Sequence, residues 1–252
     1  MTDQVITEIN NRVLTITFNR PDKKNALTHA MYAKAGDAIR DAAEDDGVRA
    51  ILITGAGDAF TSGNDLADFR DTPPIGTDTP VRRFLDALVS AEKPIVAAVN
   101  GLAVGVGLTM LLHADIVYAS ETALLSAPFV DLALVPEAAS SLLLPARVGH
   151  ARAAEIFMLG KRVPADEALT MGLVSAVYPA DALMPAAMKA AAMLAAKAPK
   201  ALKLTKMLMR GDKDVVKTRM HEEGKYFGEQ LVSSEVAEAI TAFMQKRAPK
   251  FE

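Results

Sequence analysis

Few side chains in this sequence could do chemistry on their own. The 252 residues contain no Cys and only four His. Disulfides, thiolate metal sites and a cysteine nucleophile are therefore excluded, and four scattered His leave little for a metal cluster. Catalysis by this chain would have to use carboxylates, hydroxyls, amines or the peptide backbone.

One carboxylate has a setting that suits proton transfer. Glu137 follows Pro136 in the apolar stretch LALVPEAASSLLL, where burial would raise the carboxyl pKa toward the range of a general base. A structural interpretation is equally open at this stage. Pro favours the first position of a helix, and an acidic residue in the first turn interacts well with the helix dipole.

Two glycine clusters, at 55–57 and 105–107, each follow a predicted buried strand. Neither completes a dinucleotide-binding motif, because Phe60 and Met110 occupy the third glycine position, and Walker and GxSxG motifs are also absent. Each turn taken singly is most simply a tight strand-to-helix connection. Taken together, two such turns on adjacent strands would offer free backbone N–H groups that can hold an oxyanion.

The charge balance excludes binding to nucleic acid through bulk charge. The chain has 28 Lys and Arg against 31 Asp and Glu, a net charge of −3. A local basic cluster formed by Arg20, Lys23 and Lys24 could still attract a polyanion. Two lysines in a polar turn are also commonly just solvated.

The elements that must position these residues alternate between strands and helices over the first two thirds of the chain. This alternation predicts an α/β core. The predicted strands are 13–18, 50–54, 94–99, 116–119 and 173–178, and the predicted helices include 29–44 capped by Thr28, 81–91, 108–113, one opened by Pro136, 152–159 and 165–171.

The remaining segments predict a loop and a helical tail. Three Pro and one Gly between Asp68 and Pro80 predict a mobile loop. From Asp181 to the end the pattern indicates helices only, broken near Pro199, Gly211 and Ser233.

No targeting or membrane segment is expected. The N-terminus lacks a basic region followed by an apolar one, and the apolar stretch 94–114 is interrupted by Asn100, glycines and His113. We therefore expect a cytoplasmic protein that contacts neither membrane nor nucleic acid.

In order and spacing, a set of motifs along nearly the whole chain resembles the enoyl-CoA hydratase/isomerase (crotonase) family. Any one of these motifs would be a weak signal, but together they are a strong one. The motifs are Asn19-Arg-Pro21, Lys24-Asn-Ala-Leu27, Phe60-Thr-Ser-Gly-Asn-Asp-Leu66, Lys93-Pro-Ile-Val-Ala-Ala-Val-Asn-Gly101, Ala103-Val-Gly-Val-Gly107, Ala114-Asp115 and Gly172-Leu-Val174.

The resemblance implies a fold and a substrate class. It implies a spiral of ββα units over 1–195 that binds acyl-coenzyme A, followed by a helical oligomerisation region over 196–252. A homotrimer or a dimer of trimers would be expected. Coenzyme A would enter as part of the substrate, with no permanently bound cofactor and no metal.

The resemblance also implies site residues. The backbone N–H groups of Asn64 and Val106 would hold a thioester enolate. Most relatives carry Gly at the second of these positions, so Val106 puts the shape of the acyl pocket in doubt. Contacts to coenzyme A or substrate would come from Lys23, Ala26, Leu27, Thr61, Ser62, Gly63, Asp65, Leu66 and Gly105. Asp65 could instead simply cap the next helix.

The residues that would decide the reaction favour isomerisation. In the family's hydratases two Glu hold the attacking water, and the matching positions here are Thr109 and Phe129. The surroundings of Glu137 resemble those of the single catalytic Glu in peroxisomal-type Δ3,Δ2-enoyl-CoA isomerases. The resemblance therefore implies a shuttle in which Glu137 takes a proton from C2 of a 3-enoyl-CoA and returns it to C4.

Three other functions compete with this interpretation. The first is an enoyl-CoA hydratase, or another crotonase-type activity in fatty acid metabolism that uses Glu137 differently. The second is a non-catalytic acyl-CoA binding protein, which would leave Glu137 unexplained. The third is a serine peptidase of the clp type, for which Ser62 and Ser126 have no obvious His partner.

Overall fold

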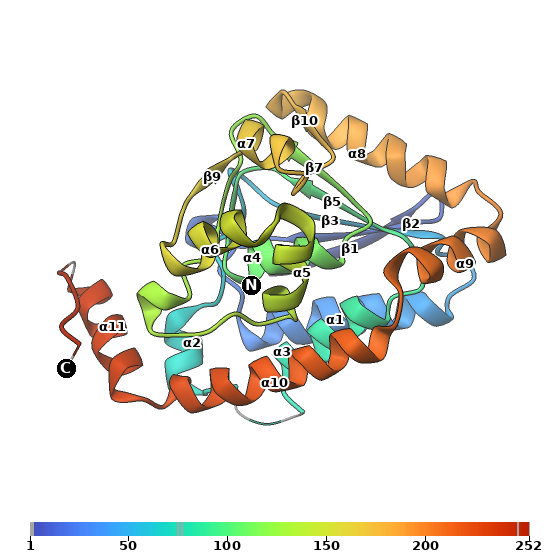
Figure 1. The fold of residues 1–252 in the computed structure, drawn as a ribbon. Helices are drawn as coiled ribbons and strands as arrows, with labels where there is room; N and C mark the ends of the chain where they lie inside the picture. The colour runs from blue at the N-terminus through green and yellow to red at the C-terminus, as the bar shows by residue number, and fades with distance from the viewer. Residues whose placement is uncertain (1–2, 75, 77, 246, 252) are drawn as a thin grey trace.

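A computed structural model describes residues 3–74, 76, 78–245 and 247–251. Its strands form two sheets (Figure 1). The larger sheet has the order β1-β2-β3-β5-β7-β10, and the smaller has the order β4-β6-β8-β9. The strands of the larger sheet are β1 Val5–Asn10, β2 Val13–Phe18, β3 Ala50–Gly55, β5 Ile95–Val99, β7 Ile116–Ser120 and β10 Ala176–Tyr178. Those of the smaller sheet are β4 Ala59–Thr61, β6 Leu102–Val104, β8 Leu124–Ser126 and β9 Val163–Pro164.

The two sheets are built by a repeated unit. Each of β3, β5 and β7 is followed within a few residues by a short strand of the other sheet, and then by helix. The long strands pair in parallel with one another, and so do the short strands β4, β6 and β8. The chain therefore winds as a spiral of ββα turns, which confirms the predicted α/β fold class.

Eleven α-helices and three 3-10 turns cover the sheets within the described ranges. The helix predicted after Thr28 is present, and the Thr28 hydroxyl accepts a hydrogen bond from the Met31 N–H at 3.3 Å. The helices are α1 His29–Glu44, α2 Leu66–Asp71, α3 Pro80–Ser90, α4 Val106–Thr109, α5 Ser140–Val148, α6 His150–Met158, α7 Ala165–Thr170, α8 Ala180–Ala195, α9 Pro199–Arg210, α10 Lys213–Leu231 and α11 Ser234–Met244. The 3-10 turns are η1 Pro21–Lys23, η2 Met110–His113 and η3 Val130–Leu132.

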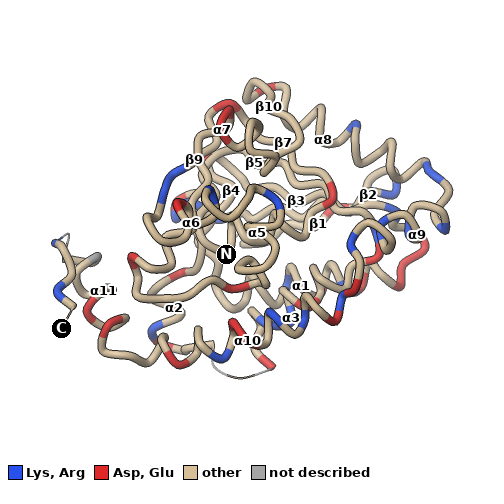
Figure 2. Tube along the Cα trace, in the orientation of Figure 1, with Lys and Arg blue, Asp and Glu red and all other residues tan. Residues whose placement is uncertain are grey.

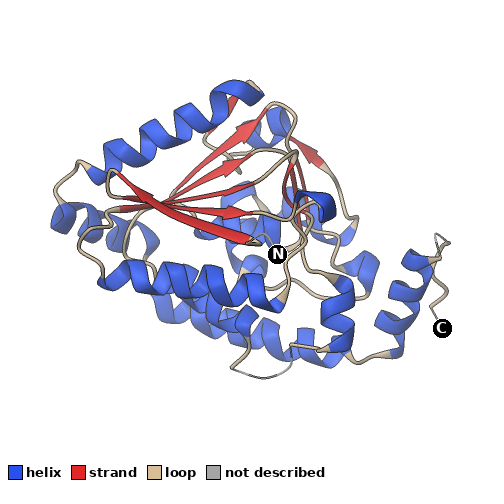
Figure 3. Cartoon of the chain, turned by 180° about the vertical axis from the view of Figure 1, so that it is seen from behind, coloured by secondary structure: helices blue, strands red, loops and turns tan. Residues whose placement is uncertain are grey.

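The central parallel strands β3 and β5 of the larger sheet are buried on both faces, as expected of parallel strands, whereas the edge strand β1 is largely exposed. One face belongs to the main core, which includes the apolar faces of α1 and α3. The other face packs against α8 through Leu183, Ala187 and Ala191. Figure 3 shows α8 lying across one side of the fanned strands, with most of the other helices on the opposite side.

The helices that follow α8 are attached to the core by charge as well as by apolar contact. Lys206 of α9 is buried and pairs with Asp115 at 2.8 Å, and Arg210 pairs with the same carboxylate at 3.3 Å. Figure 2 shows Lys, Arg, Asp and Glu distributed along α9 and α10, while the central strands are almost free of charge. In the part of the chain that the structure describes, no helix combines the length and apolar character needed to cross a bilayer.

Two local predictions were wrong. Pro136 does not open a helix: α5 begins at Ser140, because Ala138 and Ala139 both adopt left-handed backbone conformations that no helix can include. The loop predicted from Asp68 starts later, because α2 continues to Asp71 and is capped by Asp65. Positions 75 and 77 of that loop lie outside the described residues.

Candidate active site

The two glycine-containing turns that follow β4 and β6 lie against each other. A methyl group on Gly107 would come within 2.8 Å of the Thr61 side chain, and one on Gly63 within 3.0 Å of the Val104 carbonyl. Gly63 also has a φ of +93°, which other residues rarely adopt. Glycine is therefore needed here for close approach of the two turns.

Each turn carries one of the backbone N–H groups singled out in the sequence. Leu27 forms a parallel bridge with Asn64, donating to the Gly63 carbonyl at 2.8 Å and accepting from the Asp65 N–H at 2.9 Å. In such a bridge the N–H of Asn64 itself points away from Leu27. Val106 is the first residue of α4, after Gly105 at φ +56°, and an N–H at this position has no intrahelical acceptor.

Glu137 lies on the loop before α5 and reaches α4. The Thr109 hydroxyl donates a hydrogen bond to its Oε1. Glu137 is half-buried: protein atoms surround the carboxyl group closely, yet the residue keeps an accessible edge. Burial raises the pKa of Glu137 to about 7, and the negative charge of Glu223 acts in the same direction, whereas the Thr109 hydrogen bond lowers it.

The start of α5 is capped by a residue far along the chain. The N–H groups of Ala139 and Ser141 donate to the two carboxylate oxygens of Glu223, at 2.5 and 2.8 Å. Glu137 therefore does not serve as the first-turn acid of this helix. The structural interpretation of Glu137 loses its basis, and its carboxylate is left facing Thr109.

Tyr32 of α1 bonds to the turn that carries Asn64. Its hydroxyl donates a hydrogen bond to the side-chain oxygen of Asn64, and its ring packs edge-on against Phe84 with centroids 5.4 Å apart. Burial raises the pKa of the Tyr32 hydroxyl well above its usual value, and the charge of Glu137 raises it further. Tyr32 is therefore held neutral beside the turn that carries Asn64.

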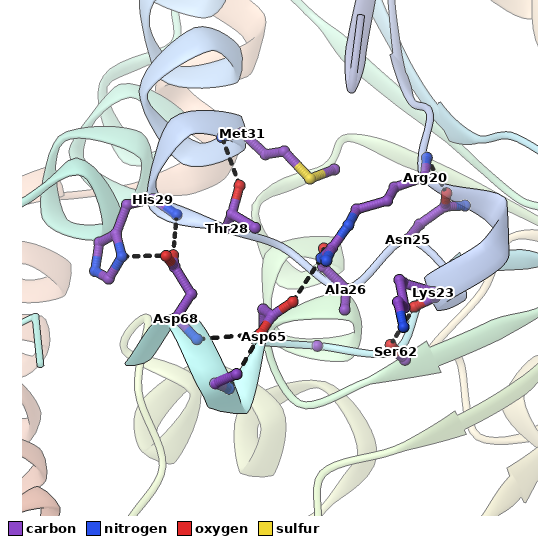
Figure 4. Close-up of polar contacts among 12 residues, drawn as sticks. Arg20, Lys23, Asn25, Ala26, Thr28, His29, Met31, Ser62, Asp65 and Asp68 are labelled. Carbon is purple, nitrogen blue, oxygen red and sulfur yellow. Dashed lines mark hydrogen bonds and ion pairs between the residues drawn. The ribbon is translucent and has the colours of Figure 1, made fainter. Parts of the chain in front are cut away.

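The segments expected to meet coenzyme A lie side by side, as Figure 4 shows. Arg20 pairs with Asp65 at 2.6 Å and also donates to the Ala26 carbonyl at 3.1 Å. Asp65 accepts hydrogen bonds from the Ala67 and Asp68 N–H groups, so it caps α2, of which Leu66 is the first residue. Its alternative interpretation as a helix cap is therefore confirmed.

The neighbouring basic and hydroxyl residues have different surroundings. Lys24 pairs with exposed Asp58 at 2.6 Å, whereas Lys23 is exposed, with its carbonyl 3.4 Å from the Ser62 hydroxyl. Thr61 is buried and donates to the Asn25 carbonyl at 2.7 Å. Of these two lysines, Lys23 is therefore the one whose side chain has no ion pair among the described residues.

The residues at the two hydratase positions are both enclosed. Thr109 is fully buried and bonded to Glu137, while Phe129 is buried against Phe157 with ring centroids 6.2 Å apart. His113 is a core residue, as expected for a His on an apolar helix. Its Nε2 lies 2.8 Å from the Ala138 carbonyl, and burial lowers its pKa to about 4.

Sequence reasoning missed Tyr32 and Glu223. Tyr32 occupies an apolar position of an amphipathic helix and matches a core residue in pattern. Glu223 lies in the polar stretch HEEGKYFGEQ, which is typical of a solvated helix face. No local signal distinguishes buried Glu223 from its exposed neighbour Glu222.

Solved structures share this architecture. The crystal structure of an enoyl-CoA hydratase/isomerase from Pseudoalteromonas atlantica T6c superimposes with a TM-score of 0.96 at 48% identity, and covers 99% of this chain and 100% of that one. The fold and the paired turns thus define a protein of the crotonase fold.

The sequence comparisons identify the family within that fold. The family model described as enoyl-CoA hydratase/isomerase matches residues 8–252, and the chain belongs to this family. It is 36% identical to enoyl-CoA delta isomerase 2 of Rattus norvegicus over 242 residues, which are 93% of this chain and 62% of that protein. The chain thus spans less than two thirds of that relative. It is 32% identical to 2,3-dehydroadipyl-CoA hydratase of Escherichia coli over 99% of this chain and 98% of that protein.

Proposed function

We propose that this protein is an enoyl-CoA isomerase that converts a 3-enoyl-CoA into the 2-trans-enoyl-CoA. Glu137 removes a proton from C2, and the electrons move through the double bond toward the thioester carbonyl. The resulting dienolate takes the same proton back at C4. One carboxylate is enough for both steps, because it acts first as base and then as acid.

The charge that develops on the thioester oxygen needs fixed donors. In this proposal the N–H groups of Asn64 and Val106 are those donors. They lie on two turns that can approach closely because glycines leave room between them. Each such donor stabilises a developing oxyanion by about 3 kcal/mol in a site that excludes water. Backbone donors need no particular side chain, so Val106 is compatible with the role.

The observation that carries the proposal is the number of available carboxylates. Glu137 has an accessible edge, and its pKa of about 7 lets it both accept and return a proton near neutrality. Among the described residues, Glu223 is the carboxylate whose charge acts on Glu137, and it is occupied by two backbone N–H groups. Thr109 and Phe129 cannot serve as bases. A single working carboxylate suits a proton shuttle better than the addition of water.

An enoyl-CoA hydratase is the second candidate. The similarity to a 2,3-dehydroadipyl-CoA hydratase, at nearly the same identity as to the delta isomerase, favours it. In a hydratase, Glu137 would have to activate a water without a second carboxylate. The Thr109 hydroxyl would be the nearest polar partner for that water.

Turnover measurements separate the two candidates. We expect conversion of 3-enoyl-CoA esters to exceed hydration of 2-enoyl-CoA esters, and Glu137→Gln to abolish the conversion while the protein stays folded. Aromatic acyl-CoA esters complete the substrate panel. Faster hydration of the 2-enoyl-CoA, or a Glu137→Gln variant that retains most of the turnover, would refute the isomerase proposal.

Coenzyme A is proposed to bind along the segment that contains Lys23, Ala26 and Leu27. Lys23 is exposed and extends from the turn beside Ser62, so it can meet a phosphate of the coenzyme. Lys24 is already paired with Asp58. A Lys23→Ala variant should raise KM for the thioester without lowering kcat, while Lys24→Ala should change KM less.

A homotrimer, or a dimer of trimers, is proposed for the assembly. Helix α9 exposes Leu208 at 76% and Met209 at 80%, together with Leu204 and Met207. A run of exposed apolar residues on one helix is typical of an interface. Analytical ultracentrifugation should give three or six times the chain mass, and Leu208→Asp should dissociate the assembly.

A further inference from the structure

Glu223 is buried in a helix whose sequence is polar. It lies on α10 and is only 5% exposed, whereas Glu222 beside it has a side chain 57% exposed. Burying a carboxylate is costly unless it is hydrogen-bonded. The structure should therefore contain specific partners for Glu223, and it does.

The partners belong to the turn that carries Glu137. The two oxygens of Glu223 accept from the N–H groups of Ala139 and Ser141, at 2.5 and 2.8 Å. Between Glu137 and α5 the backbone passes through Ala138 at φ +61° and Ala139 at φ +56°. Alanine rarely adopts this conformation, so the surrounding structure must hold it in place.

Two further hydrogen-bond contacts involve the same turn. His113 of η2 lies with its Nε2 2.8 Å from the Ala138 carbonyl, and the Ser140 N–H donates to the Glu137 carbonyl at 3.0 Å. Glu223 and His113 are thus two side chains that bond to the backbone of a strained turn. The direction in which the Glu137 side chain leaves the backbone depends on that turn.

We propose that Glu223 is a positioning residue for the Glu137 proton shuttle: its carboxylate, reaching across from α10, locks the left-handed turn at 138–139 and so aims Glu137 at the substrate. The inference rests on the proposed isomerase function. It links the helical C-terminal part of the chain to catalysis, because α10 packs against α5 and α3.

The charge of Glu223 gives this role a measurable signature. It raises the pKa of Glu137. The other ionisable groups around the pair are Tyr32 of α1, held neutral by burial, and His113 of η2, whose pKa is about 4. Burial raises the pKa of Glu223, whereas the hydrogen bonds from Ser141 and Ala139 and the charge of Arg219 on α10 act in the opposite direction. Arg219 also pairs with Glu222 at 3.1 Å.

The helix α3, which packs against α10, contributes charges that are already paired. Arg82 and Asp86 bond to each other at 3.0 Å. Removing the charge of Glu223 should therefore lower the pKa of Glu137. A loss of folding stability alone would not produce that shift.

The test compares Glu223→Gln with Glu222→Gln. The second variant removes the same charge from the neighbouring residue, which is exposed. For Glu223→Gln we expect kcat for a 3-enoyl-CoA to fall about 10- to 100-fold with little change in KM, as for a catalytic group that is slightly misplaced. We also expect the acid limb of the kcat/KM profile to move to lower pH. Glu222→Gln should match the wild type in both.

Glu223→Asp separates the charge from the geometry. It keeps the charge but shortens the side chain, so it should lower kcat while leaving the acid limb close to that of the wild type. It also serves if Glu223→Gln fails to fold. A Glu223→Asp protein with wild-type kcat would overturn the inference.

A second readout does not depend on turnover. Infrared titration of the protonated carboxyl band, with Glu137→Gln as the reference for assignment, follows the ionisation of Glu137 directly. The pKa of Glu137 should be lower in Glu223→Gln than in the wild type. An unshifted pKa of Glu137 in Glu223→Gln would overturn the inference. So would a loss of kcat in Glu223→Gln with no movement of the acid limb. Wild-type protein without isomerase turnover would instead refute the proposed function.

Discussion

The Thr109 hydroxyl donates a hydrogen bond to the carboxylate of Glu137. The resemblance to the family matches Thr109 to a position at which its hydratases carry a Glu. Thr109 therefore provides no second carboxylate in this chain, but its hydroxyl supports the carboxylate of Glu137. The bond lowers the pKa of Glu137, against the burial that raises it to about 7.

Replacing Thr109 by Val should shift the pH dependence of catalysis. Loss of the hydrogen bond raises the pKa of Glu137, so less of the base is ionised at pH 7. We expect kcat/KM at that pH to fall about tenfold, the scale of a lost hydrogen bond to a charged group, and its acid limb to move to higher pH. Steady-state kinetics across pH test this. Thr109→Ser keeps the hydroxyl and should resemble the wild type, and an acid limb that stays in place in Thr109→Val would contradict the prediction.

Tyr32→Phe should impair catalysis without removing any reacting group. It leaves the oxygen of the half-buried Asn64 side chain without its donor, which costs at most about 1–3 kcal/mol of stability, the penalty for a fully buried acceptor. Because Asn64 carries a proposed oxyanion donor, kcat should fall about tenfold. Urea denaturation and kinetics measure the two effects. Tyr118→Phe removes a hydroxyl on the α8 side of the sheet and should leave kcat unchanged.

Glu137→Gln should stabilise the protein at alkaline pH. The pKa of Glu137 is raised from 4.5 to about 7 in the folded state, so stability falls as pH rises between these values and stays lower above them. At pH 8.5 the wild type carries the whole penalty, at most about 3 kcal/mol, and the Gln variant carries none. Urea midpoints of the two proteins at pH 4.5 and pH 8.5 measure it. Equal differences at both pH values would rule out this ionisation as the cause.

Asp115→Asn should destabilise the attachment of α9. Asp115 accepts from the Ile95 N–H at 2.7 Å and pairs with buried Lys206 and with Arg210. Removing the carboxylate leaves buried Lys206 and half-buried Arg210 without a counter-charge, which costs up to about 3–5 kcal/mol. Glu92→Gln is the control, because it removes an exposed pair with Lys203 worth about 0–1 kcal/mol. Similar urea midpoints for both variants would show that the buried cluster contributes little.

Local patterns were sufficient for most of the elements. The Thr28 cap, the apolar spacing of α1 and the buried run of β5 depend on neighbours within a few positions, so the sequence indicates them directly. The start of α5 could not be predicted in this way. Pro136 signals a helix, but the backbone makes a left-handed turn at Ala138 and Ala139, where it bonds to Glu223 and His113 from distant segments.

The site divides in the same manner. The sequence by itself determined the fold class, the family and the identity of Glu137, Asn64 and Val106 as candidates, because these follow from motifs with defined spacing. Only the tertiary structure decided that Glu137 bonds to Thr109 instead of lying in the first turn of a helix. It also decided that Tyr32 bonds to Asn64 and that Glu223 bonds to the turn after Glu137. Those contacts join residues between 28 and 84 positions apart, and such pairs meet only once the sheets and helices have packed.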